Sequence, residues 1–231
     1  MLIKNLQNLK VNKKMPEITL SKRYNSLIVT FNRPNKKNAI NLYMRDVLWE
    51  ALELINLDKE INGLVFISSV DNCFSSGADI NDFGTSGSII ASKKARIERD
   101  VWKALNYIDV PVLSVVDGIA YGAGAEIALA SDWIFSTLRS QFALPEPKIG
   151  YMPAAGGTQL IIKKMPSSDA YKIAFLGESL SALRLNDFGL IAKLIEKDNI
   201  LNEVDEWCSM LLNFDVNNLR TLKNMYMQLH R

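Results

Sequence analysis

The chain alternates continuous apolar runs with segments of helical periodicity, and this alternation limits its fold more than any other feature. The runs at 63–69 (GLVFISS) and 112–117 (VLSVVD) lack the polar alternation of a half-exposed strand, so they predict buried strands. Apolar residues at three-four spacing over 44–55, behind a capping Asn41, predict an amphipathic helix between these strands. Strand–helix–strand order with buried strands predicts an α/β fold.

The rest of the core continues this pattern. Two β-rich runs fill 17–31 and end at the turn Asn32-Arg33-Pro34-Asn35. A stretch rich in Ser, Gly and Asp over 70–87 predicts a loop, and apolar spacing up to about residue 108 predicts a second helix. The segment 133–137 predicts a short strand. We find no internal repeat and no clear linker between domains.

From about Ser167 onward the pattern is helical. Two apolar stripes mark this region, one through Trp207, Met210 and Leu211 and the other through Leu219, Leu222, Met225, Tyr226 and Leu229. Such stripes pack on a protein's own core or form a subunit interface, and the pattern favours neither. We divide the chain into an N-terminal extension (1–16), a core domain (17–197) and a short helical C-terminal region (198–231) for oligomerisation or active-site cover.

Composition excludes several classes of function. With 27 basic and 25 acidic residues the net charge is +2, so no overall field attracts nucleic acid or a membrane. The two cysteines have no CxxC spacing, which argues against a disulfide framework and a zinc site. The single His230 is the penultimate residue, which argues against a Ser-His-Asp mechanism. No apolar run reaches the roughly 18 residues of a membrane span. We expect a soluble, cytoplasmic protein without a metal.

Two glutamates are the candidate catalytic groups. Glu126 lies in GIAYGAGAEIALASD and Glu146 in FALPEPKIGYMPAAGGTQ, each after a turn broken by glycine or proline. Scaffolds hold catalytic carboxylates in such places, and two carboxylates aimed at one point would have pKa values pushed apart, as an acid and a base need. Their spacing alone favours a simpler interpretation, a helix-start glutamate and an unrelated surface glutamate.

Two glycine turns could supply backbone donors beside these carboxylates. A strand feeds Gly118–Glu126, whose helix start leaves the N–H of Ala123 unpaired and able to bind an oxyanion. The run Cys73–Ile80 also follows a strand, and Gly77 permits an unusual backbone angle before Ala78, whose N–H could be a second donor. The alternative for this second run is a simple loop in which Asp79 caps the next segment.

Other interpretations of these segments are weaker. A dinucleotide fingerprint fails because Ile127 stands at the position of its third glycine. Ser75 and Ser76 lack a base that would activate them as nucleophiles. The basic run Lys93, Lys94, Arg96 and Arg99 is interleaved with acids and reads as a solvated helix face rather than an anion site.

Taken together, the segments resemble the crotonase superfamily, the enoyl-CoA hydratase/isomerase family. The matching runs are FNRPNKKNAIN (31–41), CFSSGADIND (73–82), PVLSVVDGIAYGAGAEIALASDW (111–133) and SQFALPEPKIGYMPAAGGTQ (140–159). They arrive in the family's order over about residues 17–197. The resemblance implies a spiral of ββα units, assembled as a homotrimer or a dimer of trimers, that binds an acyl-CoA thioester without a further cofactor.

The family's roles carry over by position. Ala78 and Ala123 match the residues whose N–H groups form a thioester oxyanion hole, and Glu126 and Glu146 match the two glutamates that hold and split water. The residues expected to contact coenzyme A or substrate are Lys36, Ser76, Gly77, Asp79, Ile80, Gly122 and Gly157.

Three departures bear on the substrate. Ala123 stands where hydratases commonly have glycine, so we expect its methyl near the acyl α-carbon. Lys148 puts a charge where apolar residues are usual. The tail is also shorter than a standard hydratase's, whose final helices help to cover the coenzyme and the acyl chain, so we expect this chain either to cover them differently or to leave the site more open.

The leading hypothesis is hydration of a 2-enoyl-CoA, with Glu146 serving the α-carbon and Glu126 the water. The alternative is an enoyl-CoA isomerase, which needs one carboxylate, or another reaction of the superfamily such as thioester hydrolysis or carbon–carbon cleavage. A non-catalytic CoA- or RNA-binding protein is the third class, and the intact carboxylate pair argues against it.

Overall fold

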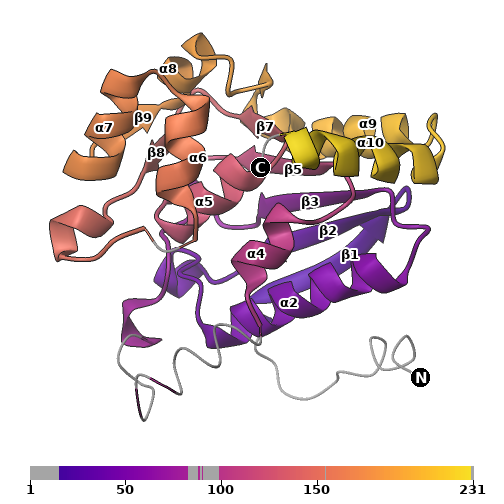
Figure 1. Cartoon of the computed structure of the whole chain (residues 1–231), viewed down its shortest axis with the longest axis horizontal. Helices are drawn as coiled ribbons and strands as arrows, with labels where there is room; N and C mark the ends of the chain where they lie inside the picture. Colours follow the sequence, from indigo (N-terminus) through magenta and orange to yellow (C-terminus); the bar gives the residue numbers. More distant parts are fainter. Residues whose placement is uncertain (1–15, 83–87, 89, 91–98, 154, 230–231) are drawn as a thin grey trace.

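A computed structural model describes residues 16–82, 88, 90, 99–153 and 155–229, and it is built on a sheet with helices on both faces (Figure 1). The sheet has the order β1-β2-β3-β5-β7-β10, formed by β1 (Ile18–Arg23), β2 (Ser26–Phe31), β3 (Gly63–Ser68), β5 (Val112–Val116), β7 (Trp133–Ser136) and β10 (Lys193–Leu194). All neighbouring pairs are parallel except β1 with β2. The predicted α/β fold is confirmed.

A second, smaller sheet carries the candidate site. Its order is β4-β6-β8-β9, formed by β4 (Cys73–Ser75), β6 (Ile119–Tyr121), β8 (Gln141–Ala143) and β9 (Ser179–Ser181). The first three strands are parallel, and β9 runs antiparallel to β8. Each of β4, β6 and β8 directly follows a strand of the large sheet along the chain, so the backbone turns from one sheet into the other three times.

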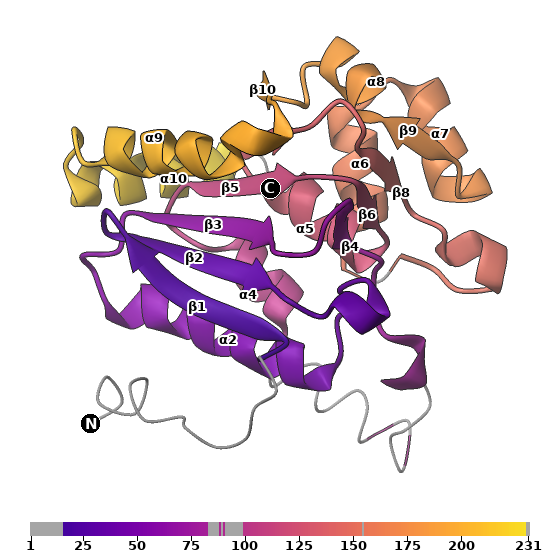
Figure 2. The ribbon, with the colours of Figure 1, turned by 180° about the vertical axis from the view of Figure 1, so that it is seen from behind.

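Helices cover the two faces of the large sheet separately. Alternate side chains of each strand point to opposite faces, so Val29 and Leu64 pack toward one set of helices while Ile28 and Val65 pack toward another. The first face carries α2 (Leu42–Leu57), α4 (Val101–Asn106) and α5 (Ala123–Ala130), and the second carries α9 (Ile200–Leu211). Figure 2 shows the second face, with α9 lying along the strands.

Three further helices gather beside the small sheet at one end of the molecule. They are α6 (Gly157–Lys164), α7 (Ser167–Leu176) and α8 (Ala182–Asp187), with 3-10 turns η1 (Pro34–Lys36), η2 (Ile80–Asp82), η3 (Glu146–Ile149) and η4 (Lys197–Asn199) elsewhere in the chain. None of the described helices is both long enough and apolar enough to cross a membrane.

Several local predictions match the structure. Asn41 caps α2, with its side chain accepting a hydrogen bond from the N–H of Met44 at 2.9 Å. The strands predicted at 63–69, 112–117 and 133–137 correspond to β3, β5 and β7. Of the basic run before α4, Lys93, Lys94 and Arg96 lie outside the described residues, and Arg99 pairs with Asp46 at 3.1 Å.

Two predictions were wrong because the strands concerned are very short. The predicted loop 70–87 contains β4, and the glycine turn predicted to follow β5 directly contains β6. Each of these strands has three residues, which is too few for a period of two to show above background. These strands form because they pair with neighbouring strands of the small sheet, and such pairing between distant segments leaves no local pattern in the sequence.

The turns between the sheets are packed against one another. A Cβ on Gly118, which follows β5, would lie 2.0 Å from the carbonyl carbon of Asn72 in the turn after β3, so only glycine fits there. Gly118 also has φ +79, a conformation that other residues rarely adopt. The two turns therefore approach each other too closely to admit a side chain at Gly118.

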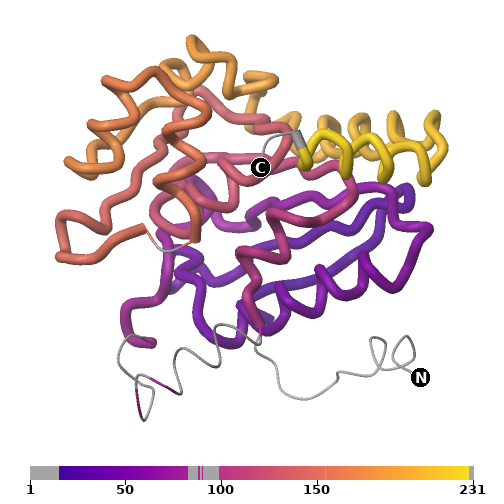
Figure 3. The backbone as a smooth tube through the Cα atoms, in the orientation of Figure 1, coloured from indigo at the N-terminus to yellow at the C-terminus, as the bar shows by residue number. Residues whose placement is uncertain are grey.

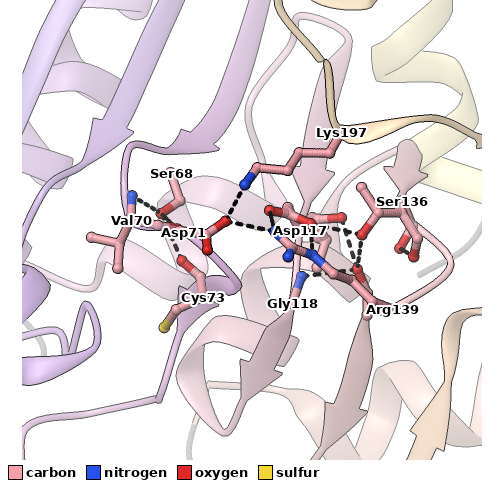
Figure 4. Close-up of polar contacts among 12 residues, drawn as sticks. Ser68, Val70, Asp71, Cys73, Asp117, Gly118, Ser136, Arg139 and Lys197 are labelled. Atoms are coloured by element: carbon pink, nitrogen blue, oxygen red, sulfur yellow. Dashed lines mark hydrogen bonds and ion pairs between the residues drawn. The ribbon is translucent and has the colours of Figure 1, made fainter. Parts of the chain in front are cut away.

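A charged network joins the same turns (Figure 4). Arg139, after β7, donates from Nε to Oδ1 of Asp117 at 2.7 Å and from Nη2 to Oδ1 of Asp71 at 2.8 Å. Lys197 binds the same oxygen of Asp71 at 2.5 Å, and these cations lower the pKa of Asp71 to about 2, with Lys197 the larger cause. One arginine thus links all three chain reversals.

The C-terminal region packs on the sheet. Trp207 and Leu211 of α9 are buried, and a Cβ on Gly63 of β3 would lie 2.7 Å from Cδ1 of Leu211 and 3.0 Å from Cζ3 of Trp207. Met210 is 42% exposed. The stripe of α9 therefore belongs largely to the protein's own core.

The last helix, α10 (Val216–Leu229), is held by a buried arginine. Arg220 is 5% exposed, pairs with Asp109, and donates to the carbonyls of Ile55 and Ile61 at 3.1 and 2.9 Å. The stripe on α10 is mixed: Leu219 packs on the core, whereas Leu222, Met225 and Tyr226 are exposed and the side chain of Leu229 is outside the described residues. Along the long axis, α10 starts at the opposite end from the segment between β8 and α6 (Figure 3).

Candidate functional site

The first component of the site is the sharp turn between β6 and α5. Gly122 has φ +50 and ψ −124, a combination open only to glycine, and it lets α5 begin immediately at Ala123. As the first residue of the helix, Ala123 has no intrahelical acceptor for its N–H, and no other described group accepts from it. The positive end of the helix dipole adds to this donor, so the position favours negative charge.

The second component is the turn after β4. Gly77 has φ +106, and a Cβ there would lie 3.1 Å from the carbonyl oxygen of Tyr121 and 3.6 Å from the backbone nitrogen of Ala123. The peptide of Ala78 therefore lies beside that of Ala123. Ala78 itself is exposed, and its N–H has no acceptor among the described residues. The two predicted donors are thus brought together.

The third component is the carboxylate of Glu126, one turn into α5. Its side chain is 3% exposed, and Oε1 accepts hydrogen bonds from the N–H groups of Ala155 and Gly157 at 2.9 and 2.8 Å. Two backbone donors on one oxygen hold the buried carboxylate in a fixed position. A Cβ on Gly157 would lie 2.9 Å from Oε1, so glycine at this position is what admits the carboxylate.

The fourth component is Glu146, at the start of η3 just beyond β8. Its Oε1 lies 2.7 Å from where a Cβ on Gly122 would be, so the carboxylate rests against the turn that opens α5. Its Oε2 is buried and has no hydrogen-bond partner among the residues that the structure describes. Burial raises the pKa of Glu146, and its backbone hydrogen bond offsets this only in part.

Both glutamates therefore lie at the first turn of α5, where the N–H of Glu126 donates to the carbonyl of Gly122 at 2.9 Å and the Glu146 carboxylate rests against Gly122. Glu126 accepts hydrogen bonds from two backbone N–H groups. Glu146 is desolvated, and its raised pKa favours the protonated form. Environments that differ in this way are what divide an acid from a base.

The residues expected around coenzyme A differ in their surroundings. Lys36 and Ile80 are exposed and Ser76 is partly exposed, and the N–H of Ser76 donates to the carbonyl of Lys37 at 2.9 Å beside them. Asp79 is buried instead, with Oδ2 2.6 Å from Nη1 of Arg33.

Asp79 and Gly157 have contacts that the sequence-based roles did not include. Oδ1 of Asp79 accepts a hydrogen bond from the N–H of Asn81 at 3.1 Å. Asp79 thus caps η2, which is the alternative role that the sequence suggested for it. Gly157 donates to Glu126, and so does Ala155, which the sequence analysis did not single out. The glycines at 156 and 157 could have indicated these donors in the sequence, because the first N–H groups of a helix have no acceptor within the helix.

The structure shows the surroundings of Ala123 and Lys148, the two residues that depart from the usual hydratase pattern. Ala123 is 4% exposed and belongs to the buried hydrophobic core. The stem of Lys148 lies against Gly177, where a Cβ would be 3.3 Å from its Cε. Within the described part of the chain no three His, Cys, Asp or Glu side chains converge as metal ligands do.

Chemically, the arrangement can stabilise an oxyanion and move protons beside it. Two backbone donors on a carbonyl oxygen favour the enolate that forms when a conjugated carbonyl compound is attacked at its β-carbon. Two carboxylates with different protonation can take a proton from a nucleophile and deliver one to carbon.

Comparison with known proteins gives consistent matches. A family model described as enoyl-CoA hydratase/isomerase matches residues 22–231. The 2,3-dehydroadipyl-CoA hydratase of Escherichia coli (strain K12) is 32% identical over 184 residues, which cover 80% of this chain and 71% of that protein. The mitochondrial enoyl-CoA hydratase of Pongo abelii is 30% identical over 176 residues, covering 76% of this chain and 60% of that protein.

Solved structures match over nearly the whole chain. A carnitinyl-CoA dehydratase from Mycobacterium avium 104 has a TM-score of 0.81 at 30% identity, covering 92% of this chain and 82% of that one. Pseudomonas aeruginosa DspI has a TM-score of 0.85 at 24% identity, covering 97% and 91%, which is a likeness of fold.

Proposed function

Because this chain belongs to the enoyl-CoA hydratase/isomerase family, we propose that it adds water across the 2,3 double bond of an acyl-CoA thioester. The observation that carries the proposal is the pair of glutamates at the first turn of α5. Glu126 is fixed by two backbone N–H groups, whereas Glu146 is desolvated with a raised pKa. A hydratase needs both carboxylates in different protonation states, and the different surroundings of Glu126 and Glu146 support this proposal.

In the proposed reaction the thioester oxygen accepts hydrogen bonds from the N–H groups of Ala78 and Ala123. Glu126, as the ionised carboxylate, orients a water and takes its proton as the water oxygen attacks the β-carbon. The electrons of the double bond move to the thioester, giving an enolate whose charge the two donors stabilise. Protonated Glu146 then delivers its proton to the α-carbon, and the saturated hydroxyacyl thioester forms.

The proposal extends to the partners of the chain. The reaction involves no net oxidation or reduction, so we propose coenzyme A, as part of the substrate, in place of a separate cofactor. Ser76 and Ile80 flank Ala78 in the sequence, and Lys36 lies beside them in space, since the hydroxyl of Ser76 donates to its carbonyl at 3.4 Å. These three residues are proposed to contact the coenzyme. We retain the cytoplasm as the proposed location, since both cysteines are free and buried.

We also propose that the chain forms a homotrimer or a dimer of trimers. Large apolar side chains are exposed beyond Glu146 and on α6 and α7, among them Met152 at 80%, Phe175 at 67% and Ile162 at 62%. Apolar surface of this kind is usual where subunits meet. Sedimentation of the purified protein measures the assembly, and a monomer at working concentration contradicts it.

The test of activity is mass spectrometry of products from a 2-enoyl-CoA and a 3-enoyl-CoA offered separately. Hydration adds the mass of one water to the first substrate. Isomerisation of the second leaves the mass unchanged and moves the double bond, which would make the isomerase the correct assignment. The Glu146→Gln variant should lose turnover and still bind coenzyme A, and turnover retained in that variant contradicts the assigned role.

A further inference from the structure

One backbone donor of the proposed oxyanion hole is connected to a charged side chain by a chain of hydrogen bonds. Arg33, in the turn after β2, donates from Nη1 to the carbonyl of Ala39 at 2.8 Å. The N–H of the same peptide, that of Ile40, donates to the carbonyl of Gly77 at 2.8 Å. The peptide of Gly77 ends in the N–H of Ala78. Two peptide groups therefore lie in series between Arg33 and the donor.

The geometry of the peptide group makes this series directional. The described residues contain no cis peptide bond, and in a trans peptide the C=O and N–H point in opposite directions. Because Ile40 holds the carbonyl of Gly77, the N–H of Ala78 must point away from Ile40, toward the side where Ala123 lies. The orientation of the donor is thus set by residues that do not touch the substrate site.

The same arginine also fixes the residue after the donor. Nη1 of Arg33 lies 2.6 Å from Oδ2 of Asp79, whose backbone N–H donates to the carbonyl of Ile40 at 3.0 Å. Arg33 further approaches Glu17 at 3.3 Å, and its side chain is 15% exposed. The guanidinium is therefore held in one position by two carboxylates and a carbonyl.

The charge adds an electronic effect to the mechanical one. A cation that donates to the carbonyl of Ala39 polarises that peptide, whose N–H becomes a stronger donor to Gly77, which polarises the next peptide in turn. The N–H of Ala78 is then a stronger donor to a developing oxyanion than an isolated peptide would be.

We propose that Arg33 is a positioning residue of the oxyanion hole, orienting and polarising the N–H of Ala78 through the peptides 39–40 and 77–78. The inference rests on the proposed function. Its prediction is that Arg33 governs stabilisation of the enolate, although among the described residues its side chain contacts Glu17, Asp79 and the carbonyl of Ala39 rather than Glu126 or Glu146.

The experiment compares Arg33→Met with Arg220→Met. Arg220 is the matched control because, like Arg33, it is largely shielded from solvent, pairs with an aspartate and donates to backbone carbonyl oxygen, but it lies on α10 away from the site. Both variants should lose stability. Only Arg33→Met should lower kcat for hydration, by about 10- to 100-fold with KM changed less than threefold, since a misaligned donor costs roughly this much in the transition state.

The second readout is the ionisation of a bound 3-oxoacyl-CoA, whose enolate absorbs in the ultraviolet. Arg33→Met should raise the pH at which the bound ligand ionises, and Arg220→Met should leave it unchanged. Asp79→Asn keeps the bond from Arg33 to Ala39, so its effect on this pH should be smaller than that of Arg33→Met. Should Arg33→Met not fold, Arg33→Lys has the same readouts, with a smaller fall in kcat because one amine replaces the two-armed guanidinium.

Wild-type kcat and ligand ionisation in the folded Arg33 variants would overturn the inference and leave the proposed function standing. Wild-type protein that neither hydrates an enoyl-CoA nor ionises the bound 3-oxoacyl-CoA would overturn the proposed function and the inference together.

Discussion

Gly122 and Glu146 are in direct contact: a Cβ on the glycine would lie 2.7 Å from Oε1 of the carboxylate and 3.4 Å from its Cδ. The residue that opens α5 and exposes the N–H of Ala123 is thus the same residue that leaves space for Glu146. The position of the proposed acid and the position of the proposed donor cannot be changed independently.

Gly122→Ala should therefore remove most activity. The new methyl displaces Glu146 and is strained at φ +50, so kcat should fall by at least about 100-fold. Gly189→Ala is the matched control, since Gly189 has φ +74 and open space around its Cβ position. It should lose about 1–2 kcal/mol from strain alone and keep its kcat. Equal activity in the two variants would contradict the role of this contact.

Glu146→Gln should stabilise the protein while it abolishes turnover. The folded state raises the pKa of Glu146, so it holds this proton to a higher pH than the unfolded chain does. Wild-type stability must then fall as pH rises from the ordinary glutamate value through the raised one. Glutamine does not ionise, so the advantage of the variant should grow across this window.

Urea unfolding of both proteins between about pH 4 and pH 8 measures that difference. A variant that is less stable than wild type at pH 7 would show that the carboxylate is not desolvated. The activity of Glu146→Gln should be lower by at least about 100-fold, the usual contribution of a general acid.

Arg139→Met should make the junction of the two sheets less stable and less sensitive to acid. Burial alone would raise the pKa of Asp117, but hydrogen bonds from Arg139 and Thr137 outweigh it and lower the pKa. Carboxylates with lowered pKa values contribute stability above their unfolded pKa and lose it as pH falls through the folded one. The gap between wild type and variant should be widest near neutrality and close toward about pH 2, the pKa of Asp71.

We expect Arg139→Met to lower the free energy of unfolding by about 1–3 kcal/mol at neutral pH. This is less than the loss for a fully buried ion pair, because the side chain of Arg139 is 38% exposed. Arg99→Met serves as the control. Its pair with Asp46 is exposed on both sides, at 60% and 56%, and should contribute less than about 1 kcal/mol. Urea midpoints from acid to neutral pH give both values, and equal losses in the two variants would rule out a special role for Arg139.

Gly63→Ala should loosen α9 from the sheet. The added methyl meets Leu211 at 2.7 Å and Trp207 at 3.0 Å, and overpacking of this kind costs about 1–3 kcal/mol. A double-mutant cycle with Leu211→Ala checks the cause, because the truncation relieves the closest clash and should cost less in the Gly63→Ala background. If the losses of stability from the two changes simply add, the cost of Gly63→Ala does not come from its contact with Leu211.

The sequence predicted the parts of this molecule that depend on local pattern. Asn41 and the three-four spacing behind it predicted α2, and the continuous apolar runs predicted β3 and β5. The identity of the candidate site residues came from a family resemblance across four runs, since no single run predicts the approach of the Gly77 and Gly122 turns.

Contacts between distant segments were beyond prediction from pattern. Strands β4 and β6 are too short to show a period, and the bonds from Ala155 to Glu126 and from Arg33 to Ala39 depend on backbone groups, which every residue possesses. Arg220 gave no signal because its partners, the carbonyls at the end of α2 and before β3, are defined only once the fold is complete.

The bonds of Arg220 also bear on how the chain acquires its fold. The carbonyls of Ile55 and Ile61 are 165 and 159 residues away from it along the sequence, and α9 completes the back of a sheet that begins at β1. Closing loops of that length costs entropy before any contact is gained, so contacts of this separation slow folding. On the ribosome, the half of the protein made first keeps an apolar sheet face uncovered until α9 has been made, and its Ile55 and Ile61 carbonyls lack their arginine until α10 follows. During that interval it is open to aggregation.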